Sequence, residues 1–295
     1  MLTRISTQEK KTYIRPKFTL RQREQFTNLI FHIVLIILGL ACLFPFYWMV
    51  STSFKTEFES FQFPPTLYPH EFIMDNYLDI TTGLPFGRFF LNSIKISFFV
   101  VFGQLFTSSL AAYGFARLQF AGKEKLFTVI LLTMMVPGIV TIIPLYIIVF
   151  KLNWVNTHLP LIIPGMLGSA YGTFLLRQFM LSLPAELEDA ARIDGCNSFQ
   201  VYRLIAIPLM KPALATLGVF TFMGVWNDFF GPIIFLDRVD MFTVQLGANL
   251  ARGQWYTSQP RLMAGAVIIT IPVLLVFFFL QRYFVRGIAL TGIKG

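Results

Sequence analysis

The stretch PAELEDAARIDG, residues 184–195, concentrates charged side chains in an otherwise apolar chain. Four carboxylates and one arginine fall within it, whereas charged residues make up only 13% of the whole sequence. Proline suits the first turn of a helix, acidic side chains stabilise its positive N-terminal end, and glycine stops it. The spacing predicts a helix of about 11 residues, which at about 1.5 Å per residue is too short to cross a membrane.

A second helix follows at once, because Asn197 or Ser198 can cap it, and we expect it to break near Pro208. Residues 182–208 therefore form a predicted helix–turn–helix loop. Leu187, Ala190, Ala191 and Asp194 share one face of its first helix. The alternative is an amphipathic helix lying on lipid headgroups, but such helices favour Lys and Arg rather than carboxylates. We interpret the loop as a docking site for a partner protein.

Trp226, Asn227 and Asp228 form a second group with possible chemistry, inside a predicted membrane span. Ionisable groups in membranes are costly and usually functional. One interpretation is a sugar path, in which the ring stacks on a pyranose face while the amide and carboxylate bind hydroxyls. The alternative is a structural clasp in which Asp228 pairs with Lys95, and the sequence leaves both open.

Other kinds of chemistry are not indicated. The three histidines and two cysteines lack the spacing of metal ligands, so we expect no metal site and no catalytic residues. The sequence contains no G-x-x-x-x-G-K-[ST] phosphate loop, so this chain binds no ATP by that route. We expect it to bind no cofactor of its own.

Membrane helices must position these groups. The chain is 55% hydrophobic with a mean hydropathy of +0.65, whereas soluble domains are about 45–50% apolar and about 25% charged. A bilayer core needs about 20 apolar residues in a helix. The segments that qualify are 28–49, 91–116, 126–150, 159–181, 212–236 and 262–284. We predict an all-α polytopic protein with six transmembrane helices, kinked at internal prolines.

The distribution of basic residues predicts the orientation. An even number of spans puts both termini on one side, and most of the 24 lysines and arginines lie there. The positive-inside rule makes that side cytoplasmic and explains the net charge of +9 without nucleic-acid binding. We expect a basic leader over 1–26, a transmembrane domain over 27–285 and a cytoplasmic tail over 286–295. The leader is too long for a cleaved signal peptide.

DAARIDG, followed by nine residues and IAIP, resembles the EAA loop of ABC importer permeases. The carbohydrate branch, and within it the maltose-type second permease, is the most similar. Collinear pieces such as AAYGFARL, VPGIVTIIPLY, VWNDFFGP and the terminal GIKG extend the resemblance over nearly the whole chain after the leader. The departures are conservative: Asp189 replaces the usual Glu, Cys196 a usual Ala, and Ile207 a usual Leu.

The resemblance implies a type I ABC importer permease fold with a cytoplasmic coupling helix, in a bacterial plasma (inner) membrane. It implies a sugar or oligosaccharide moved by alternating access, and a separate ATPase that holds ATP and Mg. The expected partners are a companion permease, two ATPase subunits and an extracytoplasmic sugar-binding protein. A self-contained secondary transporter or a channel is the alternative, disfavoured by the absence of an inverted repeat, a pore ring or a filter loop in the sequence.

The resemblance also implies roles for particular residues. Docking to the ATPase would involve Glu188, Asp189, Ala190, Ala191, Asp194 and Gly195. Trp255 and Tyr256 would contact the binding protein, and the tail residues Gly292, Lys294 and Gly295 would reach the ATPase. In this branch most sugar contacts belong to the companion permease, which weakens the assignment of Trp226, Asn227 and Asp228 to a sugar path.

Overall fold

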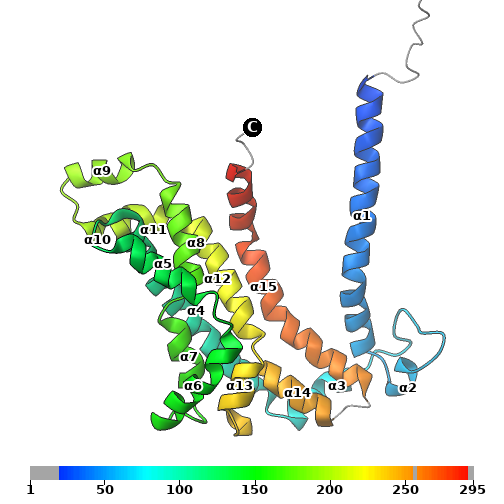
Figure 1. Ribbon diagram of the computed structural model, residues 1–295. Coiled ribbons are helices and arrows are strands. Elements are labelled where there is room, and N and C mark those ends of the chain that lie inside the picture. Colours follow the sequence, from blue (N-terminus) through cyan, green and yellow to red (C-terminus); the bar gives the residue numbers. More distant parts are fainter. Residues whose placement is uncertain (1–19, 255–257, 292–295) are drawn as a thin grey trace, which may run out of the picture. The chain divides into compact units, whose positions relative to one another are not determined.

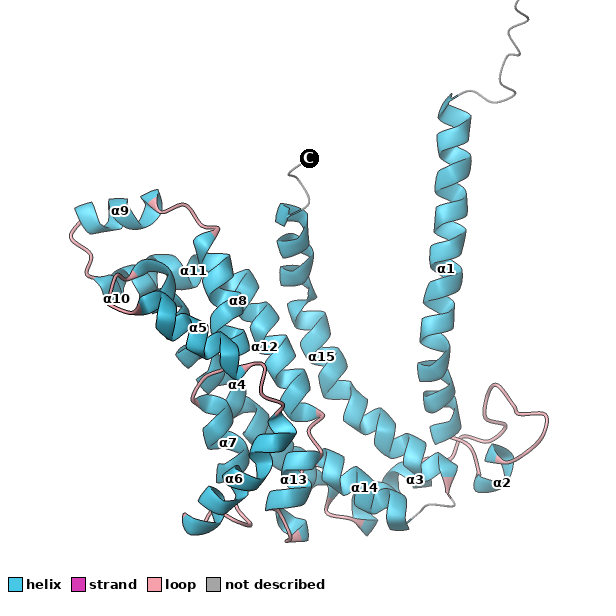
Figure 2. Cartoon of the chain, viewed as in Figure 1, coloured by secondary structure: helices cyan, strands magenta, loops and turns pink. Residues whose placement is uncertain are grey.

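A computed structural model describes residues 20–254 and 258–291, which consist of helices and connecting loops (Figures 1 and 2). Side chains are described from 24 to 253 and from 258 to 282. The first helices are α1 (Leu20–Ser53), α2 (Glu57–Ser60), α3 (Asp75–Gly83), α4 (Phe86–Arg117), α5 (Lys123–Thr133), α6 (Gly138–Lys151), α7 (Leu159–Met166) and α8 (Ala170–Leu181). They are followed by α9 (Glu186–Ile193), α10 (Ser198–Val201), the π-helix η1 (Tyr202–Ala206), α11 (Ile207–Leu209), α12 (Lys211–Trp226), α13 (Phe230–Phe235), the 3₁₀ helix η2 (Val239–Met241), α14 (Val244–Gln254) and α15 (Gln259–Thr291).

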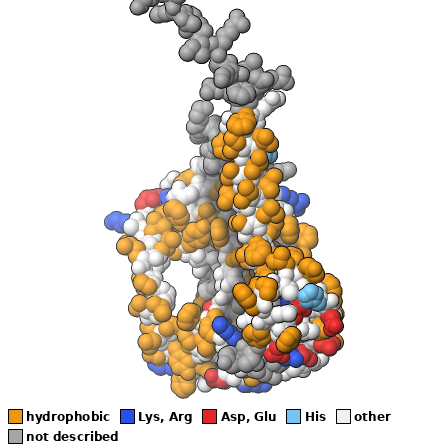
Figure 3. All heavy atoms as spheres, turned by 90° about the vertical axis from the view of Figure 1, so that its right-hand side faces the viewer, with side chains coloured by type: hydrophobic (Ala, Val, Ile, Leu, Met, Phe, Trp, Pro, Cys, Tyr) orange, Lys and Arg blue, Asp and Glu red, His pale blue; other side chains and the backbone are white. Residues whose placement is uncertain are grey.

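The chain divides into two units, Met1–Met49 and Val50–Gly295. Most of α1 belongs to the first unit, and its apolar portion has none of its side chains buried. Figure 3 shows hydrophobic side chains over the visible face of this helix. A helix that is apolar all round is typical of a membrane span.

Among the described residues, four helices are long and apolar enough to cross a membrane: Glu24–Ser53, Phe86–Arg117, Leu159–Leu181 and Gln259–Arg282. Two bent pairs could each form one more span. They are Lys123–Thr133 with Gly138–Lys151, bent by 96°, and Ser198–Leu209 with Lys211–Trp226, bent by 76°. The prediction of six spans is confirmed when each bent pair counts as one span. The break in the first pair ends at Pro137, where a kink was expected.

One predicted span differs from the structure. We expected a continuous helix over 212–236, but α12 ends at Trp226 and a separate α13 begins at Phe230. The side-chain amide of Asn227 donates to the Met223 carbonyl at 2.9 Å, and the Asp228 carboxylate accepts from the Gly231 amide at 3.1 Å. Short polar side chains compete in this way for the backbone groups of a helix, so the apolar run is interrupted.

The helices of the second unit pack around α4. A buried cluster joins it to α8, α9, η1 and α12; its members are Ala112, Tyr113, Leu176, Met180, Ala191, Val201, Tyr202, Ala206, Met210, Ala213 and Leu217. Glycine permits the close approach: a Cβ on Gly103 would lie 2.7 Å from Met166 Cβ, and one on Gly172 would lie 2.7 Å from Ser108 Oγ. Small residues at helix crossings are the usual means of tight packing in membranes.

Candidate functional site

The predicted docking helix is α9, which spans Glu186–Ile193 and lies at one end of the second unit (Figure 1). It stops in a Schellman turn. The Gly195 amide donates to the Arg192 carbonyl at 3.0 Å, and the Cys196 amide donates to the Ala191 carbonyl at 2.9 Å. This turn requires a left-handed residue, and Gly195 has φ of +87°. The expectation that Gly195 stops the helix is confirmed.

The second helical segment begins with a capping box. Asn197 Oδ1 accepts from the Gln200 amide at 2.9 Å, and Gln200 Oε1 accepts from the Asn197 amide at 2.8 Å. Two N-terminal donors are satisfied reciprocally, which selects Asn197 of the two predicted caps. The segment continues through α10, η1 and α11 to Leu209, where the chain bends into α12. The predicted break near Pro208 is therefore observed.

The structure divides the predicted docking residues between two faces of α9. Glu188 and Ala191 are buried within this chain, whereas Asp189, Ala190 and Asp194 are exposed, as is Gly195. Leu187 and Ile193 are also exposed, at 47% and 87%. The expected common face of Leu187, Ala190, Ala191 and Asp194 is thus split, because Ala191 packs into the cluster around α4.

Glu188 makes an ion pair that the sequence analysis missed. Arg117 Nε donates to Glu188 Oε1 at 2.7 Å, and the two side chains are 12% and 7% exposed. The same guanidinium donates through Nη2 to the carbonyls of Met180 at 2.9 Å and Leu183 at 3.0 Å. The two residues are 71 positions apart, so no local spacing in the sequence indicates the contact.

The residues expected along a sugar path occupy three different environments. Trp226 is 1% exposed, packs against Phe90 and Phe222, and donates from Nε1 to the Ile269 carbonyl at 3.2 Å. Asn227 is exposed, and Asp228 helps to begin α13. Among the described residues no ion pair joins Asp228 to Lys95, so the alternative of a structural clasp between them is not observed.

A largely apolar cavity with several polar side chains in its wall lies beside Asn227. It has a volume of about 530 Å³ and is lined by parts of α3, α4, α14 and α15 together with Asn227. Its polar lining residues are Asn227, Gln245, Arg252, Gln259 and Thr270. Gln245 Nε2 donates to Asn227 Oδ1 at 3.2 Å. The sequence analysis did not single out Gln245 and Arg252, because α14, which carries them, lies between the predicted spans 212–236 and 262–284.

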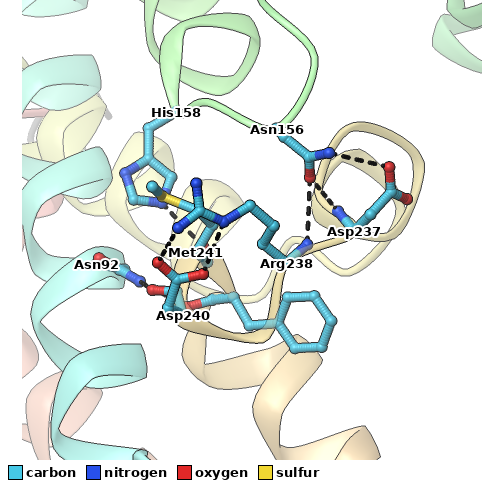
Figure 4. A network of polar contacts seen from close by, with 8 residues as sticks. Asn92, Asn156, His158, Asp237, Arg238, Asp240 and Met241 are labelled. Carbon is cyan, nitrogen blue, oxygen red and sulfur yellow. Dashed lines mark hydrogen bonds and ion pairs between the residues drawn. The ribbon is translucent and has the colours of Figure 1, made fainter.

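A network of polar contacts (Figure 4) holds the loops between α12 and α14, at the end of the second unit away from α9 (Figure 1). Asn156 donates to Asp237 Oδ2 at 3.1 Å, His158 Nε2 donates to the Met241 carbonyl at 2.8 Å, and Asn92 donates to the Asp240 carbonyl at 3.0 Å. The network therefore fixes the 237–241 segment against α4 and the start of α7.

Some expectations are not tested by these contacts. Trp255, Tyr256, Gly292, Lys294 and Gly295 lie outside the described residues. Within 20–254 and 258–291 no group of three or more His, Cys, Asp or Glu side chains is placed to hold a metal ion.

Comparison with known proteins identifies relatives. Residues 104–290 match the family described as "Binding-protein-dependent transport system inner membrane component". The chain is 34% identical to the arabinooligosaccharides transport system permease protein AraQ of Halalkalibacterium halodurans, over 85% of this chain and 91% of that protein. It is 34% identical to the lactose transport system permease protein LacG of Rhizobium radiobacter, over 91% and 97% of the two chains.

Two further similarities are to a permease named for sn-glycerol-3-phosphate and to a solved structure. The sn-glycerol-3-phosphate transport system permease protein UgpE of Pectobacterium atrosepticum is 34% identical, over 87% of this chain and 94% of that protein. The crystal structure of a bacterial ABC transporter involved in the import of the acidic polysaccharide alginate contains a chain with a TM-score of 0.76 and 24% identity. That alignment covers 92% of this chain and 100% of the other.

Proposed function

The chain belongs to the family of binding-protein-dependent transport system inner membrane components, and we propose that it moves a sugar or short oligosaccharide by alternating access. It is a multi-pass permease of an ABC importer in the inner membrane, and it is not the ATPase. Membership of this family replaces the alternatives of a self-contained secondary transporter or a channel, because an importer of this kind depends on a binding protein.

We propose that the exposed side of α9 and the turn after it contact an ATPase and couple ATP hydrolysis to transport. Asp189, Ala190, Asp194 and Gly195 lie together on it, and Ile193 adds an apolar side chain that is 87% exposed. An apolar side chain exposed at the end of a helical hairpin, next to small residues, is suited to a partner's cleft. ATP and Mg would be bound by that partner, a separate ATPase, and closure of the ATPase would move α9 as a rigid body.

The cavity beside Asn227 supports a revised sugar path. Amide and guanidinium groups of Asn227, Gln245 and Arg252 offer both donors and acceptors for hydroxyl groups. Trp226 would shape the wall beside the path rather than stack on the sugar, because its ring is buried between Phe90 and Phe222. Asp228 lines separate cavities next to α13 and is not part of the wall of this one.

The remaining parts of the proposed assembly come from the resemblance and from the family. We expect a companion permease, two ATPase subunits and an external binding protein, with both termini of this chain cytoplasmic. Trp255 and Tyr256 would contact the binding protein, and Gly292, Lys294 and Gly295 would contact the ATPase. One chain in the crystal structure of a bacterial alginate ABC transporter has a similar fold. That structure also contains an alginate pentasaccharide-bound periplasmic protein, which supports a binding-protein partner for this chain.

The test is to express the chain with its companion permease, ATPase and binding protein and to purify it through a tag on this chain. We expect the ATPase to copurify, and ATP hydrolysis in proteoliposomes to rise when the binding protein is loaded with a sugar. Arabinotriose, lactose and sn-glycerol 3-phosphate serve as probes of three chemistries. Stimulation by glycerol phosphate alone would contradict the sugar assignment. Uptake without a copurifying ATPase would contradict ATP-driven import altogether.

A further inference from the structure

Arg117 is the last residue of α4 and touches two other helices through one guanidinium. Its Nε binds the Glu188 carboxylate on α9, and its Nη2 binds the Met180 and Leu183 carbonyls at the C-terminal end of α8. The fork geometry of arginine allows one side chain to hold a carboxylate and two carbonyls at fixed angles. Arg117 therefore joins the ends of α4 and α8 to α9.

The burial of this pair makes the contact different from a surface salt bridge. Exposed pairs contribute little because water and salt screen them. Here both side chains are nearly buried, at 12% and 7% exposure, so removing either partner would leave an uncompensated charge in a poorly solvated position. The pair fixes the position of α9 for as long as it stays intact.

The backbone cannot supply the same rigidity. Loops separate α9 from α8 on one side and from α10 on the other (Figures 1 and 2). The second helical segment has its own link to α4, because the hydroxyls of Ser109 and Tyr202 lie 2.8 Å apart. On α9, the buried Ala191 contributes only van der Waals contact. Arg117 provides a directional polar tie between α9 and the membrane helices.

We propose that Arg117 is a positioning residue for energy coupling, which makes displacement of α9 move α4 and α8 together. This inference rests on the proposed function, in which the ATPase acts on α9. A loosened α9 would still bind the ATPase through its exposed side, but its movement would be absorbed by the loops. Loss of the tie should then lower the amount of sugar moved per ATP hydrolysed.

The test uses Glu188→Gln, which keeps the size and one acceptor of the side chain but removes its charge, and Arg117→Lys, which keeps the charge but loses the fork. The control is Glu124→Gln, the same substitution in an ion pair whose carboxylate is 70% exposed. Glu124 pairs with Arg177 at 3.1 Å near the same end of the second unit, and Arg177 is 13% exposed, but Glu124 lies on α5 and not on α9. All variants are assayed in the full reconstituted complex with the loaded binding protein.

We expect Glu188→Gln and Arg117→Lys to copurify with the ATPase and to lower the ratio of sugar uptake to ATP hydrolysis about fivefold or more. Glu124→Gln should keep the parent ratio. A merely destabilised protein would lose uptake and hydrolysis in the same proportion, so an unchanged ratio in Glu188→Gln and Arg117→Lys overturns the inference. If instead the parent complex recovers no ATPase, the proposed function fails, and that result is seen before any variant is compared.

Discussion

At the scale of single residues, His158 shows how burial sets the chemistry of the loop network around Met241. His158 is 6% exposed, and its Nε2 donates to the Met241 carbonyl (Figure 4). Burial lowers the pKa of His158 below its ordinary value, and nearby Lys95 lowers it further, while the Met241 carbonyl and Asp240 oppose this. The imidazole is therefore neutral at neutral pH.

The lowered pKa makes stability depend on pH in a defined direction. In the unfolded chain His158 has its ordinary pKa of about 6.5. Because the folded chain binds this proton less readily, the contribution of His158 to folding stability is present above that pH and is lost as the pH falls. We predict that the melting temperature of the purified complex drops between pH 7.5 and 5.5, and drops less in His158→Gln, which keeps a donor without titrating. The measurement is thermal unfolding of both proteins over this pH range. The same dependence of melting temperature on pH in the parent and in His158→Gln would contradict this role.

At the scale of elements, the turn after α9 combines a backbone requirement with an exposed position. Gly195 has a left-handed φ of +87°, and no atom lies within 4 Å of the position of a Cβ there. Gly122, at the start of α5, has a similar φ of +80° and the same open space. A side chain at either glycine meets the same strain, of about 1 kcal/mol. Gly195 follows the end of a helix and Gly122 precedes the start of one, and a partner is proposed to cover Gly195 alone.

We predict that Gly195→Asp abolishes uptake and lowers ATPase recovery, because overfilling a tight protein contact costs about 1–3 kcal/mol beyond the backbone strain. Gly122→Asp should keep most uptake. The measurements are transport in cells and the amount of copurified ATPase, normalised to the variant in the membrane. Similar losses in both variants would attribute the effect to backbone strain and not to docking.

At the scale of the whole molecule, the second unit presents two different ends. The α9 turn lies at one end, and α14 with the loop network around Met241 lies at the other (Figure 1). Between them, exposed leucines and phenylalanines cover α4 and α15, as expected for helices in lipid. A permease that passes movement from an ATPase to a binding protein needs its contact sites separated in this way.

This arrangement gives a prediction about partners. A photo-crosslinker at position 255 or 256 should trap the binding protein, and only when ATP turnover is stalled. The same probe at Ile193 should trap the ATPase and never the binding protein. The products are identified by mass spectrometry. Crosslinking to the binding protein that ignores nucleotide state would count against a role for Trp255 and Tyr256 in the transport cycle.

The sequence by itself predicted the membrane class, up to six spans and the local signals of the helix–turn–helix loop over 182–208. Apolar runs, Gly195 and Asn197 act over a few residues, so their effects can be read from spacing alone. The break after Trp226 had a local signal as well, in the polar pair Asn227 and Asp228, but continuous hydropathy concealed it. The high mean hydropathy of residues 212–236 predicts one span, whereas the side chains of Asn227 and Asp228 compete locally for backbone hydrogen bonds and end the helix.

Tertiary structure alone decided which of the predicted site residues are exposed and which are buried within the chain. Glu188 is buried because it pairs with Arg117, which is far away in sequence at the end of α4. The same guanidinium also donates to the Met180 carbonyl of α8. Trp226 is buried because Phe90 and Phe222 pack against its ring. Such choices depend on how helices pack at long sequence separation, and neither periodicity nor capping carries that information.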